Sequence, residues 1–239
     1  MIPAIITVRT KSTRLPNKCL LPFGAGTVLD HMINRVRNYG MRPILSTTEE
    51  PEDDVIERIA IAHRCEIYRG DPEDKMKRWL GTCERYKLDD FYTADADDLF
   101  FDGELAKEGY GLRTKTRSDI VYPIYPAPYV GHMGFSLSTV ALRRACKINS
   151  GNTEMIWKFF EKLKCIRAIK TPECYANPYR LTLDYEEDYT LLKIVLEECG
   201  WKADKAEILR FFLRNPLVYK TNWFRNEEWK RGQGEDKGD

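Results

Sequence analysis

The sequence predicts a single α/β domain with a mixed, mainly parallel central sheet flanked by helices. Strand-like and helix-like patterns alternate through the first half of the chain, as they do in βαβ units. The 239 residues fit one large domain or two small ones, and no stretch rich in Pro, Gly or Ser marks a boundary inside them. We therefore expect one domain over residues 1–225, followed by a charged, disordered tail at 226–239.

The first half contains four strand-then-loop units with three helices between them. The expected strands are the short apolar runs at 3–8, 42–47, 65–70 and 89–98, of which the last leads into an acidic turn. The expected helices are at 27–40, 51–64 and 72–87. The first helix has one apolar face, formed by Val28, Leu29, Met32, Ile33 and Val36. It ends at Gly40, and the second begins with acidic residues that complement the helix dipole.

The second half has a less regular order. We expect strands at 118–126, 131–138, 165–171 and 179–184. We expect helices at 139–147, 153–164, 186–200 and 204–215. The helix at 186–200 is the clearest of these, because its apolar residues recur at helical spacing and Gly200 stands at its end.

The composition excludes several kinds of partner. The 38 basic and 37 acidic residues nearly cancel, so no overall positive field favours a nucleic acid or an anionic membrane. No apolar run approaches the roughly 18 residues of a membrane span, and the first residues lack the flanks of a signal peptide. The seven cysteines are scattered without a C-x-x-C pair, which is typical of reduced thiols. We therefore expect a cytoplasmic protein without nucleic-acid or membrane partners.

The loop after the first strand, RTKSTRLPNK at 9–18, is strongly basic. Its four cations are Arg9, Lys11, Arg14 and Lys18. In a sheet of this type ligands bind beyond the carboxyl ends of the strands, so the loop lies where an anion site would form. Taken alone, the loop favours a polyphosphate site and a solvated basic loop equally, because it has neither a Walker lysine motif nor G-x-G-x-x-G.

Two groups of carboxylates follow other strands. YTADADD places Asp95, Asp97 and Asp98 at the end of the fourth strand, with Asp95 and Asp97 on the same side of it. Asp184 likewise ends the strand at 179–184, while the acids at 186–188 are expected to begin the next helix. Crowded carboxylates repel one another unless a cation or shared protons neutralise them, and Mg²⁺ or Mn²⁺ would do so. The alternative is an acidic surface turn.

Cations on one loop and carboxylates on two others suit a nucleoside triphosphate with its divalent cation. A metal ion bridges phosphate oxygens, and Arg or Lys neutralises the charge that develops on a leaving pyrophosphate. Both signs of charge are needed in one cleft for this chemistry. The two patterns together therefore predict a site for a triphosphate with Mg²⁺ or Mn²⁺.

VRTKSTRLPNKCL resembles the R-x-x-S-T-R-L-P-x-K signature of the cytidylyltransferases. This family includes spore coat polysaccharide biosynthesis protein F and the CMP-3-deoxy-octulosonate and CMP-sialate synthetases. The pattern continues in order with TTEEPEDDVIERIA, IYRGDPEDKMKRW, TADADDLFFDGEL and RLTLDYEEDYTLL, across about four-fifths of the chain. The resemblance implies a Rossmann-like nucleotidyltransferase fold related to the GT-A glycosyltransferases. It also implies an EC 2.7.7 type of enzyme that transfers CMP from CTP and releases pyrophosphate.

The resemblance also implies roles for the matching residues. The nucleotide would be bound by Arg9, Ser12, Arg14, Lys18, Ser46, Thr47, Thr48 and Arg78, to which we add Asp95. Mg²⁺ would be held by Asp97 and Asp184. The catalytic residues would be Arg14, Lys18 and Asp97, while Lys11 is left without a task.

The chain departs from the family pattern around the expected metal ligand. Ala96 stands where close relatives have glycine before the aspartate, and no Cys-Pro follows it. Which of Asp95, Asp97 and Asp98 binds the metal is therefore left open by the sequence. In the basic loop, Asn17 replaces a small residue that is often glycine.

The acceptor is expected to be a small acidic, phosphorylated or phosphonate molecule. By resemblance it is a sugar or sugar-like metabolite for surface polysaccharide or related biosynthesis, and the protein is a homodimer. Two other functions stay open at this point. Asp95-Ala96-Asp97 fits the D-x-D of a metal-dependent glycosyltransferase, and the altered turn fits a nucleotide-binding homologue without catalytic activity.

Overall fold

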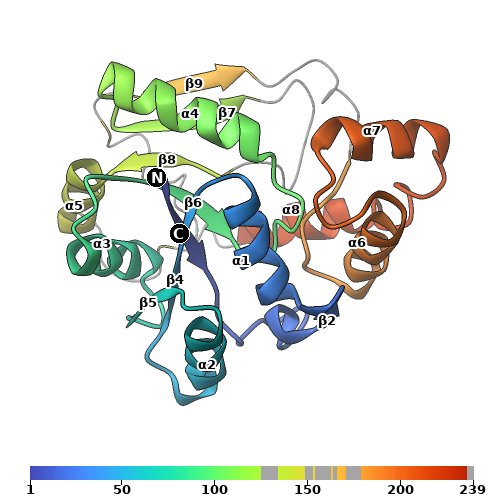
Figure 1. Ribbon diagram of the computed structural model, residues 1–239, viewed down its shortest axis with the longest axis horizontal. Coiled ribbons are helices and arrows are strands. Elements are labelled where there is room, and N and C mark those ends of the chain that lie inside the picture. The colour runs from blue at the N-terminus through green and yellow to red at the C-terminus, as the bar shows by residue number, and fades with distance from the viewer. Residues whose placement is uncertain (125–133, 149–152, 154–162, 164–165, 171–178, 236–239) are drawn as a thin grey trace.

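The computed structural model describes residues 1–124, 134–148, 153, 163, 166–170 and 179–235. A seven-stranded sheet crosses the molecule in the order β5-β4-β1-β6-β8-β7-β9 (Figure 1). Its strands are β1 (Pro3–Thr7), β4 (Arg42–Thr48), β5 (Glu66–Gly70), β6 (Asp90–Asp95), β7 (Ile120–Ile124), β8 (Ser136–Ser138) and β9 (Ile166–Lys170). Two further strands, β2 (Pro22–Phe23) and β3 (Gly26–Thr27), form a separate antiparallel pair.

The sheet is mixed and mainly parallel, which confirms the predicted fold class. β1 lies between β4 and β6 and is parallel to both, while β8 is antiparallel to its neighbours β6 and β7. Thr7 at the end of β1 is aligned with Ser46 in β4 and with Asp95 in β6. The carboxyl ends of these three strands therefore meet at one edge of the sheet, where ligands bind in folds of this kind.

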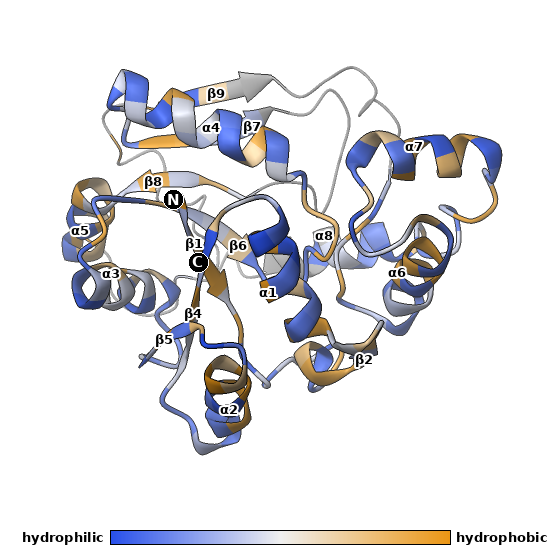
Figure 2. Cartoon of the chain, in the orientation of Figure 1, coloured by the Kyte–Doolittle hydropathy of each residue, from blue (hydrophilic) through white to orange (hydrophobic). Residues whose placement is uncertain are grey.

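Apolar cores form on the two faces of the sheet. One core includes residues of α1 (Val28–Asn38), α6 (Glu186–Cys199) and α7 (Lys205–Arg214), and the other includes residues of α3 (Lys75–Tyr86) and α5 (Thr139–Ile148). β1 supplies Ala4 and Ile6 to the first core and Ile5 to the second, because successive strand side chains point to opposite faces. In Figure 2, β1 is hydrophobic, whereas α4 and α7 carry residues of both kinds.

The remaining described helices are α2 (Asp54–Ala62), α4 (Gly103–Thr116), α8 (Arg225–Glu235) and the 3₁₀ turns η1 (Lys18–Leu20) and η2 (Pro51–Asp53). α1 shows how local sequence sets these elements. The side chains of Thr27 and Asp30 form a capping box at its start, and Gly40 after its end has a φ of 73°. The five apolar residues predicted to share one face are all fully buried.

Two expectations about the second half of the chain are corrected. Residues 179–184 were expected to form a strand, but only Arg180 makes an isolated bridge, because Leu183 N instead donates to Asp97 O beside the acidic turn. No element was expected at 103–116, where the structure has α4, begun by the Asp102 side chain accepting from Leu105 N. The helix expected at 153–164 lies almost wholly outside the described residues.

The segment expected to be a disordered tail is helical up to Glu235, so that part of the prediction is wrong. The cause is a set of contacts with the body of the domain. Arg225 forms an ion pair with Glu187 on α6, and the Trp229 ring lies 5.6 Å from the guanidinium of Arg180. Residues 236–239 are outside the described residues, and the boundary at residue 225 stays a prediction.

The described cysteines are all free thiols, which agrees with the expected absence of a disulfide framework among them. Burial raises the pKa of Cys19 and of Cys83 to about 12, so these thiols stay protonated and unreactive. Within the described part of the chain, no helix has both the length and the apolar character needed to cross a membrane.

His31 on α1 links the β2 hairpin to the segment that follows the acidic turn. Its Nε2 lies 2.8 Å from Leu99 O, and its ring contacts Phe23 edge-on at 4.8 Å. Burial lowers the pKa of His31 to about 4, so the neutral ring donates to the Leu99 carbonyl at neutral pH. His31 therefore binds a proton less readily in the folded protein than in the unfolded chain.

We predict that His31 makes the protein less stable in mild acid. Its pKa is about 4 when folded and close to 6.5 when unfolded, so the unfolded state binds more protons between these values and stability falls as pH falls through this window. Between pH 7 and pH 4.5 this loss amounts to roughly 2 kcal/mol. Urea unfolding of the wild type and of His31→Gln, which keeps a donor for Leu99, measures it. An equal loss in both proteins would contradict the prediction.

Candidate active site

The basic loop lies at the carboxyl edge of the sheet, beside the ends of β4 and β6. Val8 N donates to Ser46 O, and Ala96 N donates to Thr7 O, so both neighbouring strand ends are joined to the start of the loop. Asn17 N donates to Thr10 O and closes the loop upon itself. Asn17 has a φ of 56°, in the left-handed region that glycine favours and asparagine tolerates. This explains how asparagine replaces the glycine of the family pattern.

The structure brings two predicted cations and two predicted carboxylates together. Lys18 Nζ lies 2.8 Å from Asp97 Oδ2 and 3.0 Å from Asp184 Oδ1. Arg14 Nη2 lies 2.8 Å from the same Asp184 oxygen. These residues are up to 170 positions apart in the sequence, and the ends of β1 and β6 together with the segment after Arg180 position them. Both signs of charge therefore share one cluster, as the sequence predicts.

The opposite charges of the cluster stabilise one another against the effect of burial. Burial would raise the pKa of Asp184, but the charges of Lys18 and Arg14 outweigh it and hold that pKa at about 2. Burial likewise opposes the charge on Lys18, yet Asp97 and Asp184 raise its pKa above the ordinary value. At neutral pH both the ammonium and the Asp184 carboxylate are therefore charged.

The three acids of the YTADADD turn face different partners. Asp97 faces Lys18, whereas Asp95 Oδ1 accepts from Lys75 Nζ at 2.8 Å. Asp98 forms a hydrogen bond with Thr182, and burial together with the charges of Asp97 and Asp95 raises its pKa well above the usual range. Asp98 therefore resists ionisation, which makes it the poorest cation ligand of the three.

Lys75 is a residue of the site that the sequence reasoning missed. It lies on α3 with its side chain largely buried, and its ammonium is 5.1 Å from the centre of the Trp79 ring. A signal was present, because Lys75 precedes Trp79 and Cys83 by four and eight positions and so falls on the apolar face of its helix. A buried lysine needs a partner, and the Asp95 carboxylate supplies one.

Asp53 is a second missed residue and holds the basic loop to the end of β4. Its Oδ1 accepts from Thr10 N at 2.8 Å and from Thr10 Oγ1 at 2.7 Å. Its Oδ2 accepts from the hydroxyls of Thr47 and Thr48. Ser46 Oγ, also buried, accepts from Thr82 Oγ1 at 3.1 Å. Thr47 and Thr48 therefore help to anchor the loop through Asp53, whereas the Ser46 side chain contacts α3. The contact of these three residues with a base stays a prediction.

Arg9 and Arg78 converge on the loop between β5 and α3. Both donate through Nη1 to Pro72 O, Arg9 at 3.3 Å and Arg78 at 3.1 Å, and Arg78 also donates to Asp71 O at 2.7 Å. The two arginines thus meet at one carbonyl oxygen, that of Pro72. Ser12 Oγ accepts from Leu15 N at 3.4 Å and so shapes the basic loop.

A network of buried hydrogen bonds and ion pairs holds Asp184 in place. Arg180, which is fully buried, donates to both oxygens of Asp188 at 2.8 and 2.9 Å and reaches Asp184 Oδ2 at 3.3 Å. Asn222, just before α8, donates to Asp188 Oδ1 at 2.9 Å. Asp188 was expected only to begin a helix, whereas it also accepts from Asp184 N and Tyr185 N. The segment before α8 therefore helps to fix Asp184.

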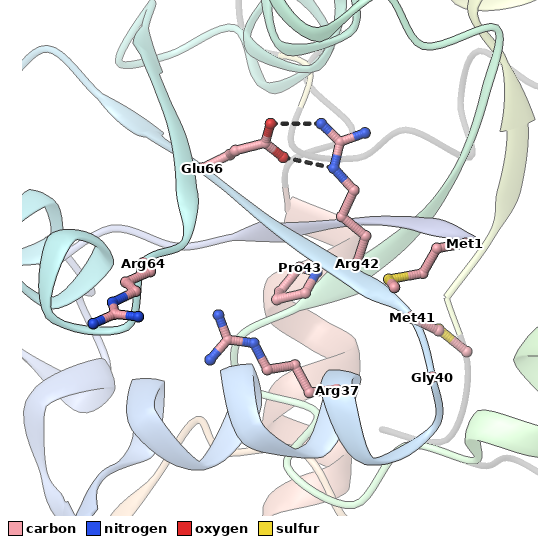
Figure 3. Close-up of a pocket in the computed structure, with 8 residues that line it drawn as sticks. All are labelled: Met1, Arg37, Gly40, Met41, Arg42, Pro43, Arg64 and Glu66. Atoms are coloured by element: carbon pink, nitrogen blue, oxygen red, sulfur yellow. Dashed lines mark hydrogen bonds and ion pairs between the residues drawn. The ribbon is translucent and has the colours of Figure 1, made fainter.

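A cavity of about 460 Å³ lies at the opposite, amino edge of β4 and β5 (Figure 3). Its polar groups are engaged within the protein. Arg42 makes two hydrogen bonds to Glu66, as Figure 3 shows, and Arg37 donates to His63 O at 2.7 Å. The cavity contains none of the predicted site residues.

Comparison with known proteins supports the residue patterns. Residues 3–94 match the family model described as cytidylyltransferase. The chain is 26% identical over 225 residues to the spore coat polysaccharide biosynthesis protein SpsF of Bacillus subtilis (strain 168), covering 89% of this chain and 94% of that protein. These similarities confirm the resemblance that the sequence motifs indicate.

Solved structures show the same fold. A cytidylyltransferase from Leptospira borgpetersenii is 23% identical, with a TM-score of 0.79 and coverage of 91% of this chain and 96% of its own. CMP:2-keto-3-deoxy-manno-octonic acid synthetase complexed with CTP is 12% identical, with a TM-score of 0.63 and coverage of 82% and 99%. Rv0371c of Mycobacterium tuberculosis H37Rv in complex with manganese is 16% identical, with a TM-score of 0.58 and coverage of 81% and 98%.

We predict that Asp53→Asn loosens the basic loop. The amide keeps one acceptor oxygen but loses the charge that two backbone N–H groups and three hydroxyls share, so stability falls by roughly 1–3 kcal/mol and nucleotide affinity falls about tenfold. Thermal unfolding with and without CTP measures both effects.

The matched control for this variant is Asp54→Asn. Asp54 is the neighbouring residue, and its side chain is 57% exposed in an ion pair with Arg69, so its loss changes stability by less than about 1 kcal/mol. Equal effects of the two substitutions would contradict the role assigned to Asp53.

Proposed function

We propose that this chain, a cytidylyltransferase and hence a nucleotidyltransferase enzyme, transfers CMP from CTP to a small acidic acceptor and releases pyrophosphate. The observation that carries the proposal is the cluster of Arg14, Lys18, Asp97 and Asp184 at the carboxyl edge of the sheet. Its cations suit a triphosphate and its carboxylates suit the divalent cation that accompanies one. The matches to the family model and to SpsF support the same reaction.

The residues present fit a divalent cation held by Asp97 and Asp184. Among the described residues, no three acidic, histidine or cysteine side chains converge as a complete ligand set. Two carboxylates are nevertheless a sufficient protein contribution for Mg²⁺, which usually completes its coordination with substrate phosphates and water. Such a cation would bridge phosphate oxygens and lower the charge on the leaving group. The fold neighbour solved with manganese supports a metal of this type, Mg²⁺ or Mn²⁺.

The reaction needs positioning and charge neutralisation from the chain. An oxygen of the acceptor attacks the α-phosphorus of CTP, and the bond between that phosphorus and the oxygen bridging to the β-phosphate breaks. Arg14 and Lys18 then face the negative charge that appears on pyrophosphate. Lys75 Nζ holds Asp95 Oδ1 at 2.8 Å, and Arg9 and Arg78 order the loop between β5 and α3 through Pro72 O.

The acceptor in this proposal is a phosphorylated, phosphonate or other acidic metabolite, sugar-like and destined for surface polysaccharide or related biosynthesis. The name of the SpsF relative supports this class. The sequence region expected to meet the acceptor is 122–138, and its residues 125–133 lie outside the described residues. The homodimeric state and the cytoplasmic location also belong to the proposal, and sedimentation analysis of the purified chain tests the first of them.

We predict pyrophosphate release when the protein is given CTP, Mg²⁺ and a panel of acidic sugars, sugar phosphates and small phosphonates. A coupled pyrophosphate assay measures it, and CTP is expected to raise the melting temperature whether or not the right acceptor is in the panel. Stabilisation by nucleotide sugars alone would favour the D-x-D glycosyltransferase. No binding of any nucleotide and no release would contradict the proposal.

We predict that Asp97→Asn lowers the rate of pyrophosphate release by roughly 100-fold or more, because the amide cannot hold a divalent cation as a carboxylate does. Asp97 is partly exposed, so the fold is retained. Glu186→Gln is the matched control, since this acid is exposed at the start of α6 and its loss is expected to change the rate less than about twofold. Tight CTP binding without turnover, unchanged by Asp97→Asn, would favour a non-catalytic homologue.

A further inference from the structure

All three N–H donors of the Lys18 ammonium are matched by oxygen atoms. Asp97 Oδ2 and Leu183 O each lie 2.8 Å from Nζ, and Asp184 Oδ1 lies 3.0 Å away. The Lys18 side chain is 17% exposed and that of Asp184 is 4% exposed, so little water reaches the pair. The ammonium is therefore surrounded by oxygen atoms of two carboxylates and one carbonyl.

The same oxygens are those that a hard divalent cation prefers. Carboxylate and carbonyl oxygens are the usual protein ligands of Mg²⁺ and Mn²⁺. An ammonium group and a divalent cation cannot share one set of three oxygens, because the two positive charges would lie within a few ångströms of each other in a weakly solvated place. Lys18 and a metal ion therefore compete for Asp97 and Asp184.

We propose that Lys18 is an exchangeable counter-ion: its ammonium fills the metal position when no nucleotide is bound and moves to the triphosphate when the metal–nucleotide complex enters. This inference rests on the proposed function and describes how the same site is regulated. Without nucleotide, Lys18 neutralises the buried Asp184 carboxylate and the partly exposed Asp97 carboxylate beside it. With nucleotide, the phosphates offer the ammonium a new set of anionic oxygens, so no charge is left unpaired.

The surrounding charges permit this movement. When Lys18 leaves, Asp184 keeps Arg14 at 2.8 Å and Arg180 at 3.3 Å. Lys18 is the first residue of η1, directly after the left-handed Asn17, so its side chain starts from the end of the basic loop that is proposed to bind the phosphates. Both the carboxylates and the phosphates are anionic, so Lys18 keeps its positive charge in either position and the exchange moves a cation without moving a proton.

The consequence is cooperative binding of metal and nucleotide. A metal ion alone has to displace Lys18 into solvent, whereas a metal ion that arrives with a triphosphate gives Lys18 a new partner. By linkage, each ligand then raises the affinity for the other by the same factor. The structure thus assigns to one lysine the task of preventing the site from filling with metal when CTP is absent.

The first test measures Mn²⁺ binding without nucleotide by the loss of the free-ion EPR signal. Lys18→Met keeps the length of the side chain and removes its charge, so we expect at least a tenfold higher Mn²⁺ affinity than in the wild type. Lys11→Met is the matched control, because Lys11 is in the same loop but is 67% exposed and pairs with Glu50. It is expected to change the affinity less than threefold. The double variant Lys18→Met/Asp97→Asn should lose the gain, which assigns the new affinity to this site.

Equal Mn²⁺ affinity in the wild type, Lys11→Met and Lys18→Met would overturn the proposal. A second measurement does not depend on the folding of any variant. The wild type is titrated with Mn²⁺ in the presence and absence of an α,β-methylene analogue of CTP, with correction for Mn²⁺ bound by the free analogue. At least a tenfold increase in affinity is expected, and an unchanged affinity would overturn the exchange.

A failure of the exchange proposal can be distinguished from a failure of the proposed function. No acceptor is present in either titration, so an absence of pyrophosphate release in the acceptor screen leaves both results valid as tests of Lys18. Conversely, pyrophosphate release by a wild type that binds Mn²⁺ equally well with and without the analogue would support the transferase and reject the exchange.

Discussion

The ammonium of Lys18 between Asp97 and Asp184 is the interaction on which the site depends. It joins the basic loop after β1 to the turn after β6 and to the segment before α6, alongside the Arg14–Asp184 ion pair and the hydrogen bond from Leu183 N to Asp97 O. Two carboxylates this close repel one another, and the cation between them makes their proximity stable. In the proposed function, the same geometry provides a site for a divalent cation and positive charges for a triphosphate, which is the combination that CMP transfer requires.

The rest of the fold holds this interaction in place from two sides. Asp53 ties the start of the basic loop to the end of β4, and His31 fixes the carbonyl of Leu99 just beyond the acidic turn. On the other side, Arg180 and Asp188 hold Asp184. Each support uses a buried polar group that is held by hydrogen bonds, which favours one geometry at that position. A site that must bind two highly charged ligands needs such rigidity, because misplaced charges would cost more than they contribute.

The sequence predicted the parts of this structure that depend on local pattern. α1 followed from five apolar residues at helical spacing, and the meeting of Lys18 with Asp97 followed from the rule that ligands bind at the carboxyl ends of parallel strands. Asp184 joins them although the strand expected at 179–184 is not formed, because Leu183 N donates to Asp97 O and holds this segment at the acidic turn. It missed Asp53, Lys75 and the role of Asp188, because their importance lies in partners that become neighbours only in the folded chain. It called the segment after residue 225 disordered from composition alone, since the contacts of Arg225 and Trp229 with distant residues leave no local signal.

The most direct test of the exchange between Lys18 and the metal ion is a crystal structure of the protein with Mn²⁺ and a non-hydrolysable CTP analogue. Its data are collected at the manganese absorption edge. If Lys18 exchanges with the metal, an anomalous peak is expected between Asp97 and Asp184, at the position that Lys18 Nζ occupies in the present structure. The ammonium of Lys18 is then expected in contact with a phosphate oxygen. A Lys18 still bound to both carboxylates, with the manganese elsewhere, would contradict the exchange.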